Sequence, residues 1–179
     1  MALVRPAIFQ VVGYQNSGKT TLTTKLINVL TETQIKTVTI KHHGHGGKPE
    51  NIPLKDTEKH LMAGALAAIV EGEGKLLLKA ENNDYTLHDQ IELMKFFQPD
   101  VILIEGYKRE PFPKLLLLRN ENDLSLLNMV SNVKAIVYWK EELHKHLALE
   151  TDVPCFHIDD NKLIFWIIEL LRELVHKID

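Results

Sequence analysis

The sequence contains a single cysteine, Cys155, among its 179 residues. One cysteine cannot form a disulfide within the chain, so the cysteine content does not point to an oxidising compartment. The strongly apolar run near the C-terminus, LIFWII at 163–168, is far shorter than the roughly 20 residues that a transmembrane helix needs. The N-terminal segment has no small-residue cleavage site, so we expect a first strand there rather than a signal peptide. These absences favour a cytoplasmic protein that does not enter a membrane.

An excess of charge of one sign is also missing. The net charge is −3, with 24 acidic and 21 basic residues, which gives no overall argument for nucleic acid or an anionic membrane as partner. The sequence shows no internal repeat, no low-complexity tract and no linker rich in Pro, Gly or Ser. A chain of this length can bury a substantial core, and we expect residues 1–179 to form one nucleotide-binding domain.

The distribution of apolar residues predicts an α/β fold. Short apolar or β-branched runs predict strands at 7–13, 36–42, 66–71, 74–80, 101–106, 114–119, 133–139 and 153–158. Helical periodicity predicts helices at 19–32, 56–64, 86–98 and 161–177, with Thr86 and Asn161 as N-caps. Alternating strands and helices, with several strands apolar throughout, indicate a mostly parallel sheet covered by helices on both faces. The pair 66–71 and 74–80 predicts an inserted β-hairpin.

The stretch GYQNSGKTTL, at 13–22, fits the phosphate-binding pattern G-x-x-x-x-G-K-[ST]. It lies between a strand and an amphipathic helix, which is the context typical of a P-loop. Backbone N–H groups and the helix N-terminus would face the phosphates, Lys19 would reach the β- and γ-phosphates, and Thr20 would offer its hydroxyl to Mg²⁺. The alternative is a glycine-rich turn that binds nothing. The residues expected to bind a nucleotide are Gly13, Asn16, Ser17, Gly18, Lys19, Thr20 and Thr21.

Two acidic residues bracket the strand at 101–106. Ligands of open α/β sheets bind at the carboxyl ends of the strands, and five residues of strand separate Asp100 from Glu105 by about 17 Å. We therefore expect Glu105 at the P-loop edge, as a metal-shell or water-orienting carboxylate, and Asp100 solvated at the opposite edge. Asp56 opens the helix at 56–64, where it is either an N-cap or a further Mg²⁺ ligand.

Basic residues gather at the same predicted edge. The segment KHHGHGG, at 41–47, follows the second strand, and imidazoles are common ligands of transition metals. The segment has no cysteine and no second ligand cluster, so a solvated loop, contacts to an anion and a structural metal site are the competing interpretations. Residues 107–119 add Lys108, Arg109, Lys114 and Arg119 against the single acid Glu110. Such cations suit a second phosphorylated ligand beside the nucleotide. The further residues expected to contact the bound nucleotide are Lys41, His42, His45 and Lys108.

Four segments together resemble the MobB family of molybdopterin-guanine dinucleotide biosynthesis adaptor proteins. They are GYQNSGKTTL (13–22), IKHHGH (40–45), KDTEKHLMAGA (55–65) and LIEGYKREPFPK (103–114). Gly46, Gly47 and Lys48 replace the acidic residue common after the histidines, Thr57 replaces the usual serine, and nothing matches beyond about residue 120. The resemblance implies a homodimeric P-loop protein that binds GTP and Mg²⁺ and is at most a slow GTPase. It also implies that the protein assists a molybdopterin-guanylyltransferase (a MobA-type enzyme), which joins GMP to molybdopterin in molybdenum cofactor biosynthesis.

Two other functions fit the same motifs. A small-molecule kinase would use Arg109 and Arg119 to close over a transferring phosphoryl group and hold an anionic acceptor. A P-loop scaffold would bind no nucleotide. No guanine-reading Asn-Lys-x-Asp segment occurs, so GTP rather than ATP is implied by the resemblance alone. The nearly all-apolar helix at 161–177 and the run KLLLL at 114–118 predict a dimer interface, unless both are buried within one monomer.

Overall fold

The computed structural model describes residues 6–42, 55–81 and 84–176. Its elements follow one another along the chain as β1 (Ala7–Gly13), α1 (Lys19–Glu32), β2 (Thr37–Lys41), α2 (Lys55–Met62), β3 (Ala67–Gly72), β4 (Lys75–Ala80), α3 (Leu87–Met94), η1 (Lys95–Phe97), β5 (Val101–Glu105), β6 (Lys114–Leu118), η2 (Glu121–Asn128), β7 (Val133–Tyr138), α4 (Glu141–Glu150), β8 (Cys155–His157) and α5 (Asn161–His176). No helix within these ranges is long and apolar enough to cross a membrane.

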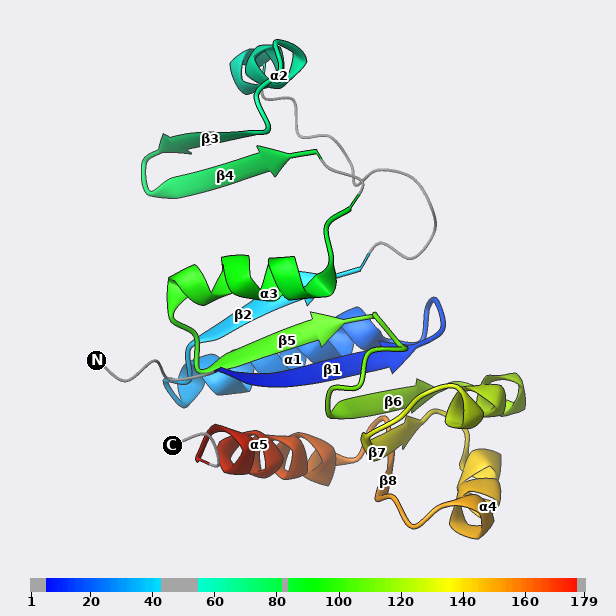
Figure 1. Ribbon diagram of the computed structural model, residues 1–179. Helices are drawn as coiled ribbons and strands as arrows, with labels where there is room; N and C mark the ends of the chain where they lie inside the picture. The colour runs from blue at the N-terminus through cyan, green and yellow to red at the C-terminus, as the bar shows by residue number, and fades with distance from the viewer. Residues whose placement is uncertain (1–5, 43–54, 82–83, 177–179) are drawn as a thin grey trace.

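A six-stranded sheet forms the centre of the molecule, in the order β2-β5-β1-β6-β7-β8, and each pair of neighbouring strands is parallel (Figure 1). Helices α1 and α5 share one apolar cluster with one face of the sheet. On the other face, α3 packs beside β2 and β5, and η2 and α4 pack beside β6 and β7. Strands β5 and β6 are buried at every position, as strands covered on both faces must be. The predicted α/β fold with helices on both faces is confirmed.

Side-chain hydrogen bonds to backbone N–H groups mark the starts of α3 and α5. The prediction of Thr86 as the N-cap of α3 is confirmed, and Asp89 completes a capping box: Thr86 Oγ1 accepts from Asp89 N at 3.1 Å, and Asp89 Oδ2 accepts from Thr86 N at 2.9 Å. At α5 the prediction of Asn161 as the cap is wrong, because Asp160 Oδ1 accepts from Lys162 N at 2.8 Å and Asn161 is already helical. The elements η2 and α4 were not predicted, since α4 buries only two apolar residues, Leu143 and Leu147.

The predicted antiparallel hairpin is confirmed, with β3 and β4 paired from Ala67 and Ala80 to Gly72 and Lys75. Its two turn residues, Glu73 and Gly74, have φ of +50° and +78°, and positive φ at both positions is typical of a type I′ turn. The hairpin and α2 stand beyond α3, apart from the six-stranded sheet (Figure 1).

The apolar residues of the hairpin are exposed, whereas the two segments predicted to form a dimer interface are mostly buried. Strand β6 is wholly buried, and α5 contributes four core residues, Leu163, Ile167, Ile168 and Leu171. Phe165 of α5 remains 72% exposed. Both segments therefore belong mainly to the core of one chain, because β6 lies between two other strands and α5 covers the sheet. The exposed apolar side chains of the hairpin are Ile69, Val70, Leu76, Leu77 and Leu78.

Candidate nucleotide site

The loop between β1 and α1 adopts a shape that requires its two glycines. A Cβ atom on Gly13 would lie 2.6 Å from Ser17 Oγ and 2.8 Å from the carbonyl oxygen of Leu117. Gly18 has φ of +87°, in the left-handed region, and its Cβ would lie 3.0 Å from the ring of Trp139. The buried Ser17 hydroxyl makes no hydrogen bond to the described residues. The loop is thus a tight backbone cradle at the N-terminus of α1, as phosphate binding needs.

The ends of three elements meet beside this loop. Thr20 Oγ1, in the first turn of α1, donates to the carboxylate of Glu105, 2.8 Å from Oε1 and 3.0 Å from Oε2. Lys41, at the end of β2, places its Nζ 3.4 Å from Glu105 Oε1 and donates to Thr20 Oγ1 at 3.2 Å. Glu105 is 8% exposed. The structure therefore brings together Thr20, Lys41 and Glu105, as the strand directions predict.

Asp100 lies at the opposite end of β5 from Glu105. It was expected to be solvated, but its Oδ2 accepts from the backbone N–H of Lys36 at 2.7 Å. Its carboxylate thus joins the start of β5 to the residue before β2. This contact is structural and lies at the edge of the sheet away from the P-loop.

Positive charges surround the P-loop lysine. Lys19 Nζ donates to the carbonyl oxygen of Tyr14 at 2.7 Å. Burial lowers the pKa of Lys19 below its ordinary value; Glu105 opposes this shift, and the nearby Lys108, Lys41 and Arg119 add to it. A polyanion bound here would offset the mutual repulsion of these cations and favour the charged form of Lys19.

A cavity of about 1180 Å³ opens over these groups. Most pockets for small molecules have volumes of roughly 300–1,000 Å³, so this cavity has room for a nucleotide and more. Its lining combines the P-loop with the ends of β2, β5 and β6. Of the predicted site residues, those that line it are Gly13, Asn16, Ser17, Gly18, Lys19, Thr20, Thr21, Lys41, His42, Glu105 and Lys108.

Asp56 is not brought to this cavity. It lies on α2, its side chain is 86% exposed, and its Oδ1 pairs with Lys59 Nζ at 3.0 Å. Of the three residues predicted to bind a metal, only Thr20 and Glu105 therefore lie at the cavity. His45, the remaining predicted site residue, lies outside the described residues.

A metal held by protein side chains alone has no support in the described ranges, where no group of three or more His, Cys, Asp or Glu residues is close enough to bind an ion. One hydroxyl and one carboxylate do suit Mg²⁺, which usually keeps several waters and takes further oxygens from the phosphates of its substrate. Thr20 and Glu105 therefore fit a Mg²⁺ ion that arrives with a nucleotide.

The loop after β5 is held from below by buried polar groups. Gln10 Nε2 donates to the carbonyl oxygens of Gly106 at 3.1 Å and Tyr107 at 2.9 Å. Lys114 was counted among the cations of the ligand edge, but it is fully buried and donates to the carbonyl oxygens of Lys108 and Glu110. Burial lowers the pKa of Lys114. Lys114 therefore supports the loop after β5 from the interior, because its ammonium group donates to carbonyl oxygens of that loop.

His42 and Tyr107 form an aromatic pair at the rim of the cavity. Their ring centroids are 4.5 Å apart, and Tyr107 OH accepts from Gln90 Nε2 of α3 at 2.7 Å. The backbone N–H of His42 donates to the carbonyl oxygen of Glu105 at 2.9 Å. His42 is thus a packed rim residue that joins β2 to the end of β5.

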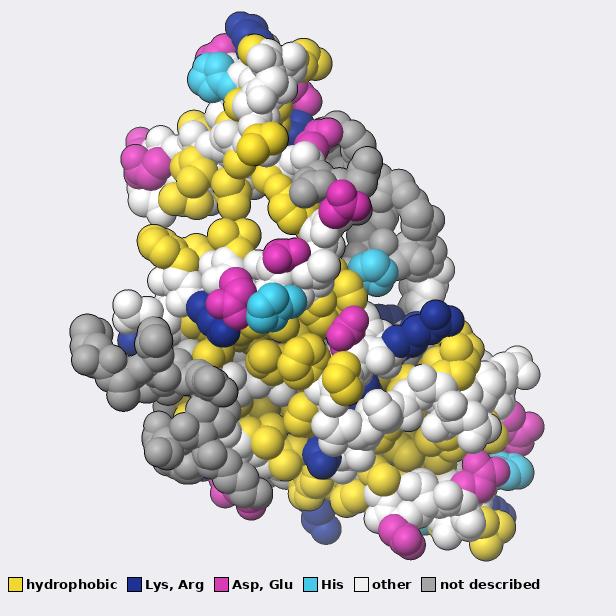
Figure 2. All heavy atoms as spheres, viewed as in Figure 1, with side chains coloured by type: hydrophobic (Ala, Val, Ile, Leu, Met, Phe, Trp, Pro, Cys, Tyr) yellow, Lys and Arg dark blue, Asp and Glu magenta, His cyan; other side chains and the backbone are white. Residues whose placement is uncertain are grey.

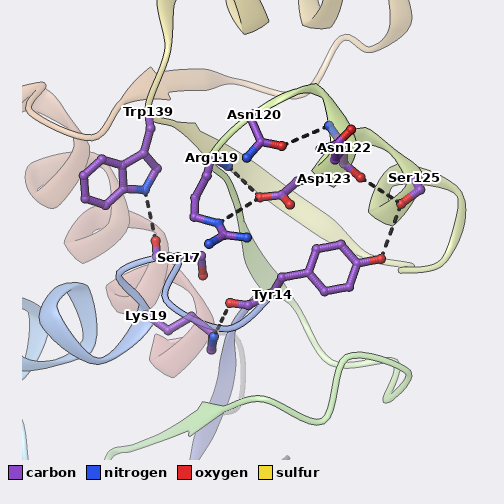
Figure 3. A network of polar contacts seen from close by, with 9 residues as sticks. All are labelled: Tyr14, Ser17, Lys19, Arg119, Asn120, Asn122, Asp123, Ser125 and Trp139. Atoms are coloured by element: carbon purple, nitrogen blue, oxygen red, sulfur yellow. Dashed lines mark hydrogen bonds and ion pairs between the residues drawn. The ribbon is translucent and has the colours of Figure 1, made fainter.

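Trp139 was missed by the sequence reasoning. Its indole Nε1 donates to the carbonyl oxygen of Ser17 at 3.0 Å, which holds the P-loop to the end of β7 (Figure 3). Tyr14, also in the P-loop, lies 3.3 Å from Ser125 Oγ through its hydroxyl and stacks under Lys108 Nζ at 4.6 Å. The rule that carboxyl ends of parallel strands share one edge could have identified Trp139.

Comparison with known proteins identifies relatives over most of this chain. Residues 8–139 match the family model described as molybdopterin guanine dinucleotide synthesis protein B. A probable molybdopterin-guanine dinucleotide biosynthesis adapter protein of Bacillus subtilis (strain 168) is 42% identical over 174 residues, covering 96% of this chain and 98% of the relative. The crystal structure of Bacillus subtilis MobB superposes with a TM-score of 0.78 at 36% identity, over 91% of this chain and 96% of that one. A MobB homolog from Bacillus stearothermophilus gives 0.74 at 32% identity, over 93% and 98%.

Proposed function

Because the chain belongs to the family of molybdopterin guanine dinucleotide synthesis protein B, we propose that it is a GTP-binding adapter that assists the attachment of GMP to molybdopterin. The observation that carries the nucleotide-binding part is the contact of Thr20 Oγ1 with Glu105 at 2.8 Å, beside a loop that requires its glycines. A hydroxyl and a carboxylate at this place are the protein groups that a Mg²⁺-nucleotide needs. The guanine in the names of the relatives favours GTP over ATP.

Each residue of the site has a distinct task in this proposal. The P-loop backbone and Lys19 bind the phosphates, and Thr20 and Glu105 hold Mg²⁺, which supplies positive charge to the phosphate oxygens when bound. Glu105 is also the candidate to orient a water molecule. It is already shared between Thr20 and Lys41, so one carboxylate would serve both metal and water. We therefore expect slow hydrolysis of GTP at most.

The spare room in the cavity suits a second anionic ligand. Lys108 and Arg109 line the cavity on the loop after β5, beyond the residues that contact Thr20. Buried hydrogen bonds from Gln10 and Lys114 hold this loop in place. The names of the relatives make molybdopterin the ligand to test and a molybdopterin-guanylyltransferase the partner enzyme.

Calorimetric titration tests the proposal, with GTP and with ATP, in Mg²⁺ and in EDTA. We expect GTP to bind more tightly than ATP and Mg²⁺ to strengthen binding. The chain should then increase the yield of guanine dinucleotide when added to a guanylyltransferase with GTP and molybdopterin, whereas Lys19→Ala should not. Absence of GTP binding by the unmodified chain would overturn the nucleotide-binding part, and a yield no higher than that of the guanylyltransferase alone would overturn the adapter part.

One observation supports the alternative function of a small-molecule kinase: Arg109 and Arg119 both line the cavity. Cations in such positions can stabilise a phosphoryl group during transfer. Product analysis of GTP and ATP with molybdopterin present separates the two functions. A phosphorylated acceptor formed in proportion to nucleoside diphosphate would favour the kinase, and unchanged molybdopterin would favour the adapter.

We also propose that two copies of the chain pair through the β3–β4 hairpin. An isolated two-stranded hairpin is marginally stable in water, and this one exposes apolar residues on both faces; Ile69, for example, is 59% exposed. Figure 2 shows apolar side chains on the hairpin and, across an open gap, on the layer that contains α3. That layer adds the exposed Leu93, Phe96 and Phe97. A second hairpin would cover these surfaces and pair with the free strand edges.

Sedimentation equilibrium at micromolar concentration tests the dimer. Leu78→Lys places a charge on the hairpin and should shift the equilibrium toward the 20.5 kDa monomer. Phe165→Lys is the matched control, because Phe165 is exposed on α5, away from the hairpin. A 20.5 kDa species without concentration dependence in the unmodified chain would contradict the dimer. Dissociation by Phe165→Lys instead of Leu78→Lys would move the interface to α5.

A further inference from the structure

Arg119 lies on the side of the P-loop opposite to Glu105. Strand β1, which leads into the P-loop, has β5 on one side and β6 on the other. Strand β5 ends at Glu105, beside Thr20, whereas β6 ends at Leu118 and is followed directly by Arg119. Arg119 lines the cavity, and Figure 3 shows its side chain over the loop, between Tyr14 and Ser17. The P-loop therefore has a carboxylate on one side and a guanidinium group on the other.

A buried carboxylate fixes the position of this guanidinium group. The side chain of Asp123, in η2, is 3% exposed. Its Oδ2 accepts from the backbone N–H of Arg119 at 2.8 Å and from Nε at 3.4 Å (Figure 3). The turn is tied further, since Asp123 N donates to the carbonyl oxygen of Asn120 at 3.0 Å and Asn120 Oδ1 accepts from Asn122 N at 3.0 Å. Arg119 is thus held through its Nε and its backbone.

The two terminal nitrogens of Arg119 make no hydrogen bond to any of the described residues, although the side chain faces the cavity. Their pair of N–H groups has the geometry that binds two oxygens of one phosphate. Arg119 is also one of the cations that lower the pKa of Lys19. Arg119 is therefore close enough to the P-loop to act on the same anion as Lys19.

The orientation of a bound nucleotide then follows from the different residues on the two sides of the P-loop. Thr20 and Glu105 occupy the metal side, where they would hold a Mg²⁺ ion that offsets the negative charge of the terminal phosphates. The opposite side must receive the remaining part of the nucleotide, which begins with the α-phosphate. We propose that Arg119 binds the α-phosphate of the nucleotide and that Asp123 is its positioning residue. This inference rests on the proposed nucleotide-binding function.

Calorimetric titration of GTP and GDP, in Mg²⁺ and in EDTA, tests the assignment. Arg119→Ala should weaken both nucleotides about tenfold, because a charged hydrogen-bonded contact is lost. The loss should be equal in Mg²⁺ and in EDTA, since the α-phosphate lies away from the metal. Arg119→Lys keeps the charge without the paired N–H groups, so it should recover only part of the affinity. Unchanged affinity in Arg119→Ala, or a loss confined to Mg²⁺, would overturn the assignment to the α-phosphate.

A double-mutant cycle tests the positioning role of Asp123. Asp123→Asn should weaken GDP binding, and adding it to Arg119→Ala should cause no further loss, because both changes act through one contact. Losses that multiply would show that Asp123 acts independently of Arg119. Glu121→Gln is the control for charge in the same turn, since Glu121 pairs with His146 and does not line the cavity. If Asp123→Asn does not fold, the Arg119→Ala and Arg119→Lys affinities still decide the α-phosphate contact.

These outcomes are separable from failure of the proposed function. If the unmodified chain binds neither GTP nor GDP, the nucleotide site itself is wrong. If it binds them and Lys19→Ala does not, but Arg119→Ala binds like the parent, the site stands and only the role of Arg119 is wrong.

Discussion

Glu105→Gln removes the negative charge that contacts Thr20. In the free protein this carboxylate lies 3.4 Å from Lys41 Nζ, and the Lys41 side chain is largely exposed. Pairs with an exposed partner contribute less than about 1 kcal/mol, and the glutamine carbonyl can still accept from Thr20. We therefore expect the free energy of unfolding to change by about 1 kcal/mol or less.

The effect on Mg²⁺-dependent binding should be larger. Two unit charges about 4 Å apart interact by about 4 kcal/mol at an effective dielectric constant near 20. Water that replaces the carboxylate recovers part of this energy, so we expect a net loss of about 1.4 to 2.7 kcal/mol, or ten- to hundredfold in GTP affinity. Titration in EDTA should show little difference between Glu105→Gln and the unmodified chain.

Asp100→Asn is the matched control for Glu105→Gln. It makes the same chemical change at the other end of the same strand, and its amide oxygen can still accept from Lys36 N. GTP affinity should stay unchanged with and without Mg²⁺, and thermal unfolding should confirm that both variants fold. Equal losses in EDTA and in Mg²⁺ for Glu105→Gln, or a larger loss for Asp100→Asn, would refute the assignment of the metal side.

Three further predictions concern the P-loop. Lys19→Ala should weaken GTP at least tenfold, about 1.4 kcal/mol, with little change in melting temperature, because the lost bond to Tyr14 is offset by relief of a buried charge; parental affinity would contradict the P-loop assignment. The pKa of Lys19 is lowered and phosphate binding requires its charged form, so GTP affinity should fall as pH rises through that pKa, starting at lower pH than for an ordinary lysine; a pH titration in which Lys19→Ala shows the same slope would exclude Lys19 as the cause. Gly18→Ala should lower the free energy of unfolding by about 1–2 kcal/mol, because alanine disfavours the left-handed backbone of this position. The loss should be larger still, because Trp139 lies 3.0 Å from the new Cβ. In chemical unfolding, Gly74→Ala isolates the backbone cost, since nothing lies within 4 Å of its Cβ; equal losses would mean that the Trp139 contact is easily relieved.

The parts of the site that sequence could predict are those set by strand direction. Glu105 and Lys41 end neighbouring parallel strands, so one rule about carboxyl ends places both beside the P-loop. The buried strands β5 and β6 could also be predicted from the sequence, because a strand covered on both faces needs a continuous apolar run.

Other features depend on contacts between distant segments and could not be predicted in this way. Lys114 resembles any surface lysine in the sequence, and only the fold shows that it lies under the carbonyl groups of the loop at 106–110. The pairing of Asp123 with Arg119 needs the turn of η2, a short 3₁₀ helix without a strong periodic pattern. Asp56 lies in the first turn of α2, which begins at Lys55, so it is neither the first helical residue nor the N-cap; the position of this helix depends on its packing against β3.

The bond from Trp139 to Ser17 gives this protein a built-in optical probe. Its other tryptophan, Trp166, lies on α5 and packs against Phe156 with ring centroids 5.5 Å apart, among residues of the core. One indole therefore reports on the P-loop through its hydrogen bond and its contact with Gly18, while the other reports on the folded core. With one tryptophan at a time replaced by phenylalanine, ligand binding and global unfolding can be followed separately by intrinsic fluorescence in the same unlabelled protein.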